Sequence, residues 1–156
     1  MNPFRKRYAP AILISLTWIT LAAAFSFTAF ASDQPEEPPM PTLLMTLGET
    51  HLRITLEDNP TTRDLVSQLP LTLEFEDFHG IEKISYLPRK LSTEGAARGW
   101  DPQKGSLTYY APWGNLAFFY QDFDYSTGLI PLGEAESGLE ALEANETFTA
   151  TLTLVE

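Results

Sequence analysis

Short runs in which apolar and polar residues alternate are the feature that most constrains the fold of this chain. In residues 51–56, apolar Leu52, Ile54 and Leu56 alternate with polar neighbours, and residues 148–155 repeat the pattern. Successive side chains of a strand point to opposite faces, so a period of two indicates strands with one buried face.

The order of these runs predicts the fold class. Residues 42–47 and 51–56 flank a short glycine-containing turn, which predicts a β-hairpin. A short helix should follow, with Asn59 or Thr61 as its N-cap. Further strands are expected at 71–76, 81–87, 106–110, 116–120, 129–132 and 148–155, a second short helix at 137–144, and a loop at 88–105. Many short strands with two short helices predict a mainly β fold, a closed antiparallel β-barrel.

The start of the chain has the pattern of a secretory signal peptide. Basic residues 5–7 precede an uncharged, strongly apolar stretch at residues 8–31, which ends in the small-x-small pattern of a cleavage site. We therefore expect residues 1–31 to be removed by cleavage after Ala31, and the protein to be exported to the periplasm or the extracellular space. The alternative is a retained N-terminal membrane anchor, because about 20 apolar residues can span a bilayer.

The remainder of the chain is predicted to be one acidic domain. Residues 32–41 are rich in Pro and Glu, which is typical of an extended linker, and residues 42–156 have the size of one domain. Three of the ten basic residues and none of the 21 acidic residues precede residue 32, which leaves seven against 21 and a net charge of −14. Such a surface repels phosphate backbones, so we expect no nucleic-acid partner, and no membrane partner after signal cleavage.

Side chains that support common catalytic chemistry are sparse. The chain has no cysteine, and its two histidines, His51 and His79, show no close metal-ligand spacing. Residues 122–128 resemble the start of a calcium loop, but Gly133 stands where the bidentate glutamate is needed, which favours an ordinary acidic turn. We therefore expect no metal site, no cofactor and no catalytic residue.

Residues 109–120 contain six aromatic side chains in twelve positions. Strand alternation in residues 116–120 predicts that about half of the six are core. Trp113 lies in a turn between Pro112 and Gly114, where it either caps the barrel end or packs over a cleft; capping is the favoured interpretation.

Three segments, in the right order, resemble cyclophilins. Residues 52–65 resemble the opening strand and helix start, residues 116–120 the central strand with paired phenylalanines, and residues 132–142 the late glycine-spaced turn and helix. The fuller pattern, with residues 109–116 and 129–133, is similar to a bacterial family of cyclophilin-like proteins whose biochemical role is largely unassigned. That match is closer than the match to prolyl isomerases, and it implies a cyclophilin-like barrel.

The same resemblance implies a departure from the isomerase site. Cyclophilins carry a Phe-His-Arg run whose arginine holds the prolyl carbonyl, whereas the similar run here is Phe78-His79-Gly80. A glycine has no side chain to donate those hydrogen bonds, so Lys83 or Arg89 is the candidate substitute. Catalysis requires preferential stabilisation of the twisted amide, and an apolar pocket alone binds without much acceleration.

We therefore expect a non-catalytic module that binds a peptide or a small ligand. The alternative is a weak peptidyl-prolyl cis-trans isomerase with a rearranged site, in which Phe119 packs on the proline ring. The residues predicted to line the ligand groove are Phe78, Lys83, Tyr86, Tyr110, Trp113 and Phe119.

Overall fold

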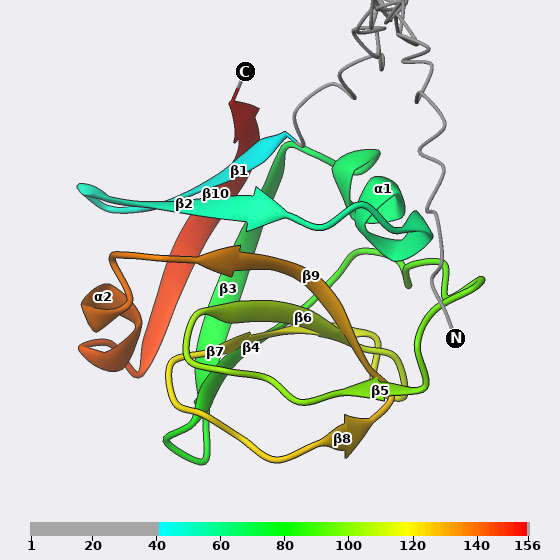
Figure 1. Ribbon diagram of the computed structural model, residues 1–156. Helices are drawn as coiled ribbons and strands as arrows, with labels where there is room; N and C mark the ends of the chain where they lie inside the picture. The colour runs from blue at the N-terminus through cyan, green and yellow to red at the C-terminus, as the bar shows by residue number, and fades with distance from the viewer. Residues whose placement is uncertain (1–40, 156) are drawn as a thin grey trace, which may run out of the picture. The chain divides into compact units, whose positions relative to one another are not determined.

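The computed structural model describes residues 41–155, which form a closed antiparallel barrel with two short helices (Figure 1). The order of strands around the barrel is β1-β10-β3-β4-β7-β6-β9-β2, and β5 and β8 form a separate two-stranded sheet. The elements are β1 (Thr42–Leu47), β2 (Thr50–Leu56), α1 (Pro60–Val66), β3 (Leu71–Phe78), β4 (Glu82–Tyr86), β5 (Gly99–Trp100), β6 (Ser106–Tyr110), β7 (Asn115–Phe119), β8 (Ser126–Thr127), β9 (Leu129–Ala135), α2 (Glu140–Glu143) and β10 (Thr147–Val155). The predicted fold class is confirmed.

The predicted signal peptide and most of the predicted linker lie outside the described residues. Within residues 41–155, no helix is long and apolar enough to cross a membrane.

Local signals account for the first elements. The β1–β2 hairpin turns at Gly48, whose φ of 57° lies in the left-handed region that glycine adopts without steric cost. Asn59 caps α1, because its side-chain oxygen accepts a 2.8 Å hydrogen bond from the backbone N–H of Thr62. The Asn59 side chain also donates a 2.8 Å hydrogen bond to the backbone oxygen of Pro131, which ties the start of α1 to β9.

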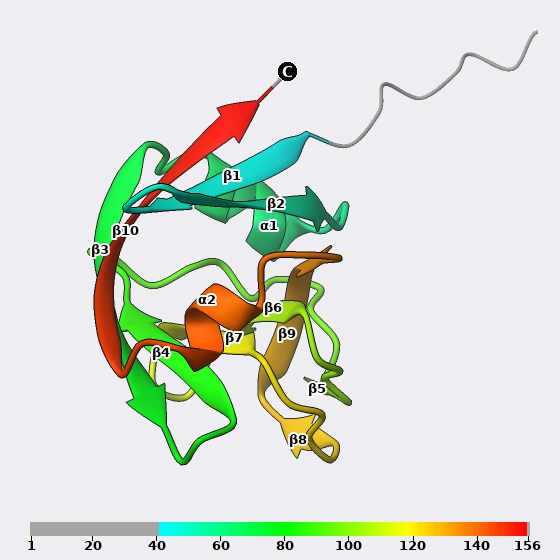
Figure 2. The ribbon, with the colours of Figure 1, turned by 90° about the vertical axis from the view of Figure 1, so that its left-hand side faces the viewer.

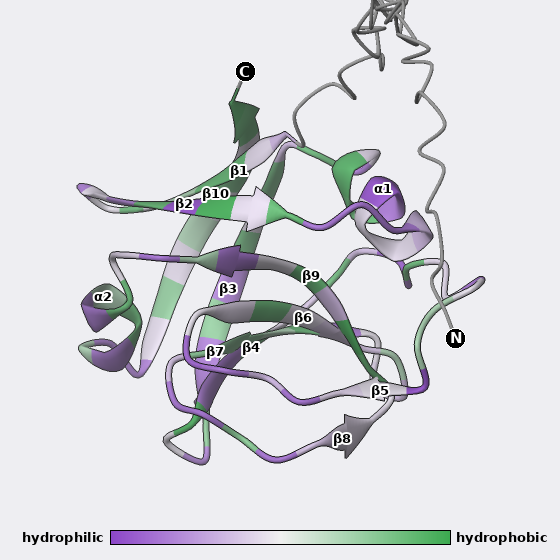
Figure 3. Cartoon of the chain, viewed as in Figure 1, coloured by the Kyte–Doolittle hydropathy of each residue, from purple (hydrophilic) through white to green (hydrophobic). Residues whose placement is uncertain are grey.

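Alternation along the strands places one face of each in the main core. Figure 3 shows this pattern as alternating hydrophobic and hydrophilic bands along β3 and β10. On β7, Leu116 and Phe118 are fully buried in that core, which also receives Leu65 from α1. Ala117 and Phe119, on the opposite face of β7, belong to a second, smaller cluster with Ile84 and Leu129. The strand therefore packs on both faces, as its continuous apolar sequence requires.

The loop that precedes β5 is attached to α1 rather than free. Arg89 donates two hydrogen bonds to the carboxylate of Asp64, and the backbone N–H of Ser92 donates a third at 2.7 Å. The next anchor is the Tyr109 hydroxyl, which accepts a 3.1 Å hydrogen bond from the backbone N–H of Leu91. Figures 1 and 2 place α1 and the β5–β8 sheet at opposite ends of the domain.

Element boundaries differ from the predictions where pairing extends or shortens a segment. β9 runs to Ala135 instead of ending at Leu132, because its last residues pair with β2. The second helix is confined to Glu140–Glu143. The loop predicted at 88–105 contains β5, which pairs with the equally short β8, a strand too brief to produce a periodic pattern.

Candidate binding pocket on the outer face of the barrel

A row of three side chains across β3, β4 and β7 forms one end of the candidate site. Phe78 pairs with Glu82, and Glu82 pairs with Phe119 in the antiparallel register. Residues directly opposite in antiparallel strands project to the same face. Phe119 belongs to the smaller cluster and not to the main core, so this row lies on the outer face of the barrel wall.

A second row crosses β4 at Tyr86, four residues after Glu82, and Tyr86 pairs with Asn115 on β7. Tyr110 on β6 pairs with Asn115 on β7 and with Leu129 on β9. Between the two rows stands Ala117, whose side chain is a single methyl group. The large side chains on either side and the small one between them leave a hollow in the outer face.

Two aromatic residues from connecting segments border this hollow. Trp113, in the β6–β7 turn, packs edge-on against Phe78 at 5.5 Å and against Tyr110 at 5.4 Å between ring centroids. Phe123, in the segment before β8, stacks on Phe119 at 6.1 Å. Trp113 thus covers a cleft, the alternative to the capping role that the sequence favoured.

The resulting cavity, here called the outer pocket, has a volume of about 260 Å³. Its lining residues are Phe78, Glu82, Tyr110, Trp113, Asn115, Ala117, Phe119, Phe123, Ser126 and Leu129. A side pocket of about 180 Å³ shares four of these residues and adds His79 and Ile81. Pockets for drug-sized ligands typically measure roughly 300–1,000 Å³, so the outer pocket suits a small molecule or one side chain.

Two polar groups in the outer pocket lack hydrogen-bond partners within the described part of the chain. Burial raises the pKa of the Glu82 carboxyl to about 7, and its Oε2 atom is buried without a partner. Asn115 is 1% exposed, and its Oδ1 atom also has no partner among these residues. Buried polar groups are almost always hydrogen-bonded, so these two acceptors are open to a donor from water or from a ligand.

Four of the six predicted groove residues come together here: Phe78, Tyr110, Trp113 and Phe119 all line the outer pocket. Tyr86 does not; it is 57% exposed and borders a separate depression beside Glu74 and Glu76.

The structure also places Lys83 outside the pocket. The Lys83 side chain is on the inner face of β4, where its ammonium lies 2.6 Å from the Asp77 carboxylate and 5.0 Å from the centre of the Tyr120 ring. Burial by itself would raise the pKa of Asp77, but hydrogen bonds from Lys83, Tyr120 and the backbone N–H of Gly80 outweigh it and lower the pKa to about 2. Lys83 is therefore a structural ion-pair partner.

Sequence reasoning missed Glu82, Asn115, Ala117, Phe123, Ser126 and Leu129 as pocket residues. Glu82 carried no local signal, because its face is opposite to that of Lys83 and depends on the register that β4 adopts against β7. Phe123 carried no such signal, since its position depends on the path of a loop.

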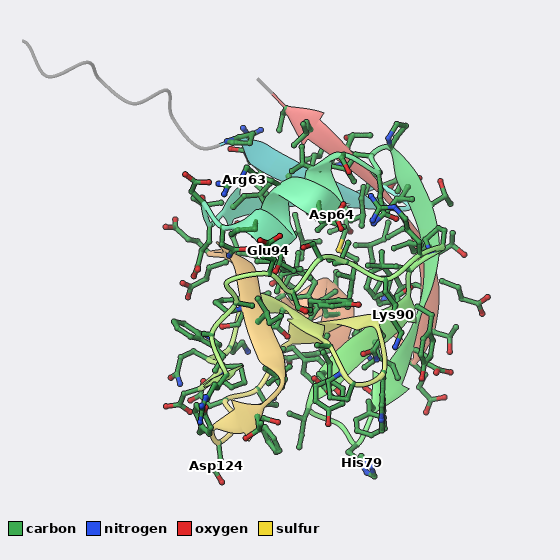
Figure 4. All side chains as sticks on the ribbon, turned by 90° about the vertical axis from the view of Figure 1, so that its right-hand side faces the viewer. Arg63, Asp64, His79, Lys90, Glu94 and Asp124 are labelled. Atoms are coloured by element: carbon green, nitrogen blue, oxygen red, sulfur yellow. The ribbon has the colours of Figure 1, made fainter. Side chains whose placement is uncertain are left out.

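The Phe78-His79-Gly80 run forms the β3–β4 turn. His79 and Gly80 both have positive φ, 58° and 70°, and the Asp77 carboxylate accepts a 2.9 Å hydrogen bond from the Gly80 N–H. His79 lines the side pocket. Figure 4 places His79 and Asp124 at the end of the domain away from Asp64 on α1. In residues 41–155 no group of three or more His, Asp or Glu side chains is arranged to hold a metal ion.

Comparison with known proteins agrees with this architecture. The sequence profile of the Cyclophilin-like family matches residues 45–153, most of the chain, and the protein belongs to that family. Its structure is similar to the solution structure of a hypothetical protein from Archaeoglobus fulgidus, with a TM-score of 0.55 and 13% sequence identity, over 78% of this chain and 100% of the archaeal one. At that identity the likeness concerns the fold alone. No curated protein matches the sequence significantly.

Proposed function

We propose that this domain is a non-catalytic binding module that holds a small ligand, or one side chain of a peptide, in the outer pocket. The observation that carries the proposal is the outer pocket beside Ala117, whose lining includes the aromatic residues Phe78, Tyr110, Trp113, Phe119 and Phe123. Cavities lined by apolar and aromatic side chains with a few polar groups are the usual form of a ligand site.

Two aromatic side chains at the border of the outer pocket remain partly exposed to solvent. Trp113 remains 47% exposed and Phe123 44% exposed, although both pack against other rings. A bound apolar group would remove further area of both rings from water, at roughly 25 cal/mol per Å². This exposed aromatic surface supports a partner that completes the packing.

The position of the cationic side chains favours binding over prolyl isomerisation. The isomerase alternative needs a fixed donor above the pocket, and the two candidates are engaged elsewhere: Lys83 with Asp77, and Arg89 with Asp64. Among the residues lining the outer pocket, none is Lys or Arg. A pocket without that donor supplies apolar contact but little preferential stabilisation of a twisted amide.

The test uses 2-phenylethanol and a proline-containing tetrapeptide as probes. Binding is followed by two-dimensional NMR, in which the indole N–H of Trp113 and the amides of β7 report on the pocket. We expect saturable shifts from at least one probe, weakened by Trp113→Ala and unchanged by Tyr86→Ala, which removes an exposed aromatic side chain outside the pocket. The tetrapeptide should isomerise at its spontaneous rate.

Catalysis of isomerisation that disappears in Phe119→Ala and persists in Tyr86→Ala would instead establish the weak isomerase. Absence of binding by every probe, with no isomerisation, would contradict both functions.

A further inference from the structure

We propose that the ligand of the outer pocket is an organic ammonium ion that carries at least one N–H donor, with Glu82 as its counter-charge. This inference rests on the binding function proposed above and names the chemical class of the ligand.

The charge of the pocket is the first argument. Glu82 is the sole Asp, Glu, Lys or Arg among the residues that line the outer pocket and the side pocket. It lies between Phe78 and Phe119 in the same cross-strand row, so its carboxyl group is flanked by rings and has no basic partner within the described residues. A carboxylate in such a place favours a cation and disfavours an anion.

The unpaired oxygens are the second argument. Both the Oε2 atom of Glu82 and the Oδ1 atom of Asn115 are hydrogen-bond acceptors, and both are buried without a partner among residues 41–155. An acceptor is satisfied by a donor, so the ligand should bring N–H groups rather than further acceptors. This requirement favours a primary, secondary or tertiary ammonium over a quaternary one.

The aromatic border is the third argument. Tyr110 on β6, Trp113 in the β6–β7 turn and Phe119 on β7 line the same cavity. Aromatic ring faces attract cations, Trp most strongly, and a desolvated cation held among rings is a recurrent mode of ammonium recognition. The apolar part of the amine would pack over Ala117, where the wall offers space.

The groups that face Glu82 determine its response to pH. His79 in the β3–β4 turn and Tyr110 on β6 are the titratable neighbours that share its two pockets; Asp122 and Asp124 border a separate depression beside Phe123. Burial already raises the pKa of Glu82 to about 7. An ammonium ion would stabilise the ionised form and lower that pKa, so its binding should release a proton below about pH 7.

The ammonium can belong to a free amine or to a lysine side chain of a peptide, and two probes separate these sources. The first is 2-phenylethylamine, compared with its neutral analogue 2-phenylethanol, and the second is N-acetyl-lysine N-methylamide. Titration calorimetry on the protein, on Glu82→Gln and on Glu74→Gln measures each affinity. Glu74→Gln is the matched control, because it removes an exposed carboxylate of β3 outside the outer pocket.

We expect at least one ammonium probe to bind more tightly than 2-phenylethanol at about pH 8, by roughly 10- to 100-fold, the range for hydrogen bonds to charged groups. Glu82→Gln should abolish this preference, whereas Glu74→Gln should leave both the preference and the affinity for 2-phenylethanol unchanged. The preference should shrink at about pH 5.5, where Glu82 is largely protonated.

Binding of 2-phenylethanol without any preference for the amines would overturn this inference and leave the binding function intact. A preference that survives Glu82→Gln would overturn it as well. If no probe binds, the binding function itself fails, and the ammonium inference fails with it.

Discussion

Glu82 and Lys83 are adjacent in sequence but project to opposite faces of the barrel wall. Glu82 pairs with Phe119 on the outer face, where burial raises the pKa of its carboxyl group to about 7. Lys83 pairs with Phe118 on the inner face and makes an ion pair with Asp77. One peptide unit therefore separates a carboxyl group that lines the pocket from an ammonium group that stabilises the barrel.

Replacement of Glu82 by Gln should remove a pH-dependent loss of stability. The folded-state pKa of Glu82, about 7, lies above the ordinary value of 4.5, so its contribution to stability is complete below about pH 4.5 and is lost as the pH rises through 7. As the pH rises from 4.5 to 8, the free energy of unfolding of Glu82→Gln should increase relative to that of the wild type by on the order of 2–3 kcal/mol. Urea unfolding at a series of pH values measures this, and identical pH profiles for both proteins would contradict it.

Loss of the Asp77 charge should destabilise the barrel more than loss of Lys83. Asp77→Asn leaves the buried ammonium group of Lys83 without its counter-ion, and should cost roughly 2–4 kcal/mol. Lys83→Met removes the buried charge and retains an apolar stem, so its cost should be smaller. Chemical denaturation of both variants measures the two losses of unfolding free energy. A larger loss in Lys83→Met than in Asp77→Asn would contradict this prediction and would mean that water easily reaches the Lys83 ammonium.

Acid should weaken this same ion pair. The pKa of Asp77 is lowered from 3.8 to about 2 in the folded protein, so the stabilisation it confers is present above about pH 4 and is lost as the pH falls towards 2. The wild type should therefore lose stability over this range, and Asp77→Asn should lose less. Thermal unfolding followed by circular dichroism at pH 2 to 5 measures the difference.

Filling the outer pocket should block binding without unfolding the domain. Ala117 lines the pocket from the centre of β7, so the longer side chain of Ala117→Leu would occupy the hollow. We expect ligand shifts in the NMR spectrum to disappear and the free energy of unfolding to fall by roughly 1–3 kcal/mol, because Ala117 is buried and its neighbours must shift to admit the longer side chain. Tight binding by this variant would place the ligand elsewhere.

The Asp64 carboxylate should hold the loop that follows β4. It accepts hydrogen bonds from Arg89 and from the backbone N–H of Ser92, and the Arg89 hydrogen bond is the main reason that the pKa of Asp64 is lowered to about 2. Asp64→Ala should speed amide hydrogen exchange at Ser92 and cost about 1 kcal/mol.

Arg63→Ala is the matched control on the same helix. Arg63 pairs with Asp58 at an exposed position, and exposed ion pairs contribute little, so this variant should cost less than about 0.5 kcal/mol. Figure 4 labels the side chains of Arg63 and Asp64 on α1. Equal exchange rates at Ser92 in the two variants would contradict the anchoring role of Asp64.

Local patterns were sufficient for much of the fold. The alternation of Leu52, Ile54 and Leu56 predicted β2. Asn59, one of the two predicted caps of α1, is the residue that caps it. Strand alternation and capping depend on residues within a few positions of one another. The short β5 and β8 were not predictable in this way, since two residues cannot display a period.

The candidate site could be predicted from the sequence only in part. The aromatic residues in 109–120 and Phe78 before the β3–β4 turn predicted most of the border of the site. Large aromatic side chains in turns and on the outer faces of strands are unusual unless they pack against a partner. The role of Lys83 could not be derived, since its face depends on the register that β4 adopts against β7.

The sequence by itself determined the strand pattern, the local turns and the cyclophilin-like class, because each follows from contacts between near neighbours or from motifs in a fixed order. Only the tertiary structure decided that Glu82, Ala117 and Trp113 surround one cavity. Their meeting requires barrel closure, strand register and loop paths to agree, and those are properties of pairings between residues far apart in the chain.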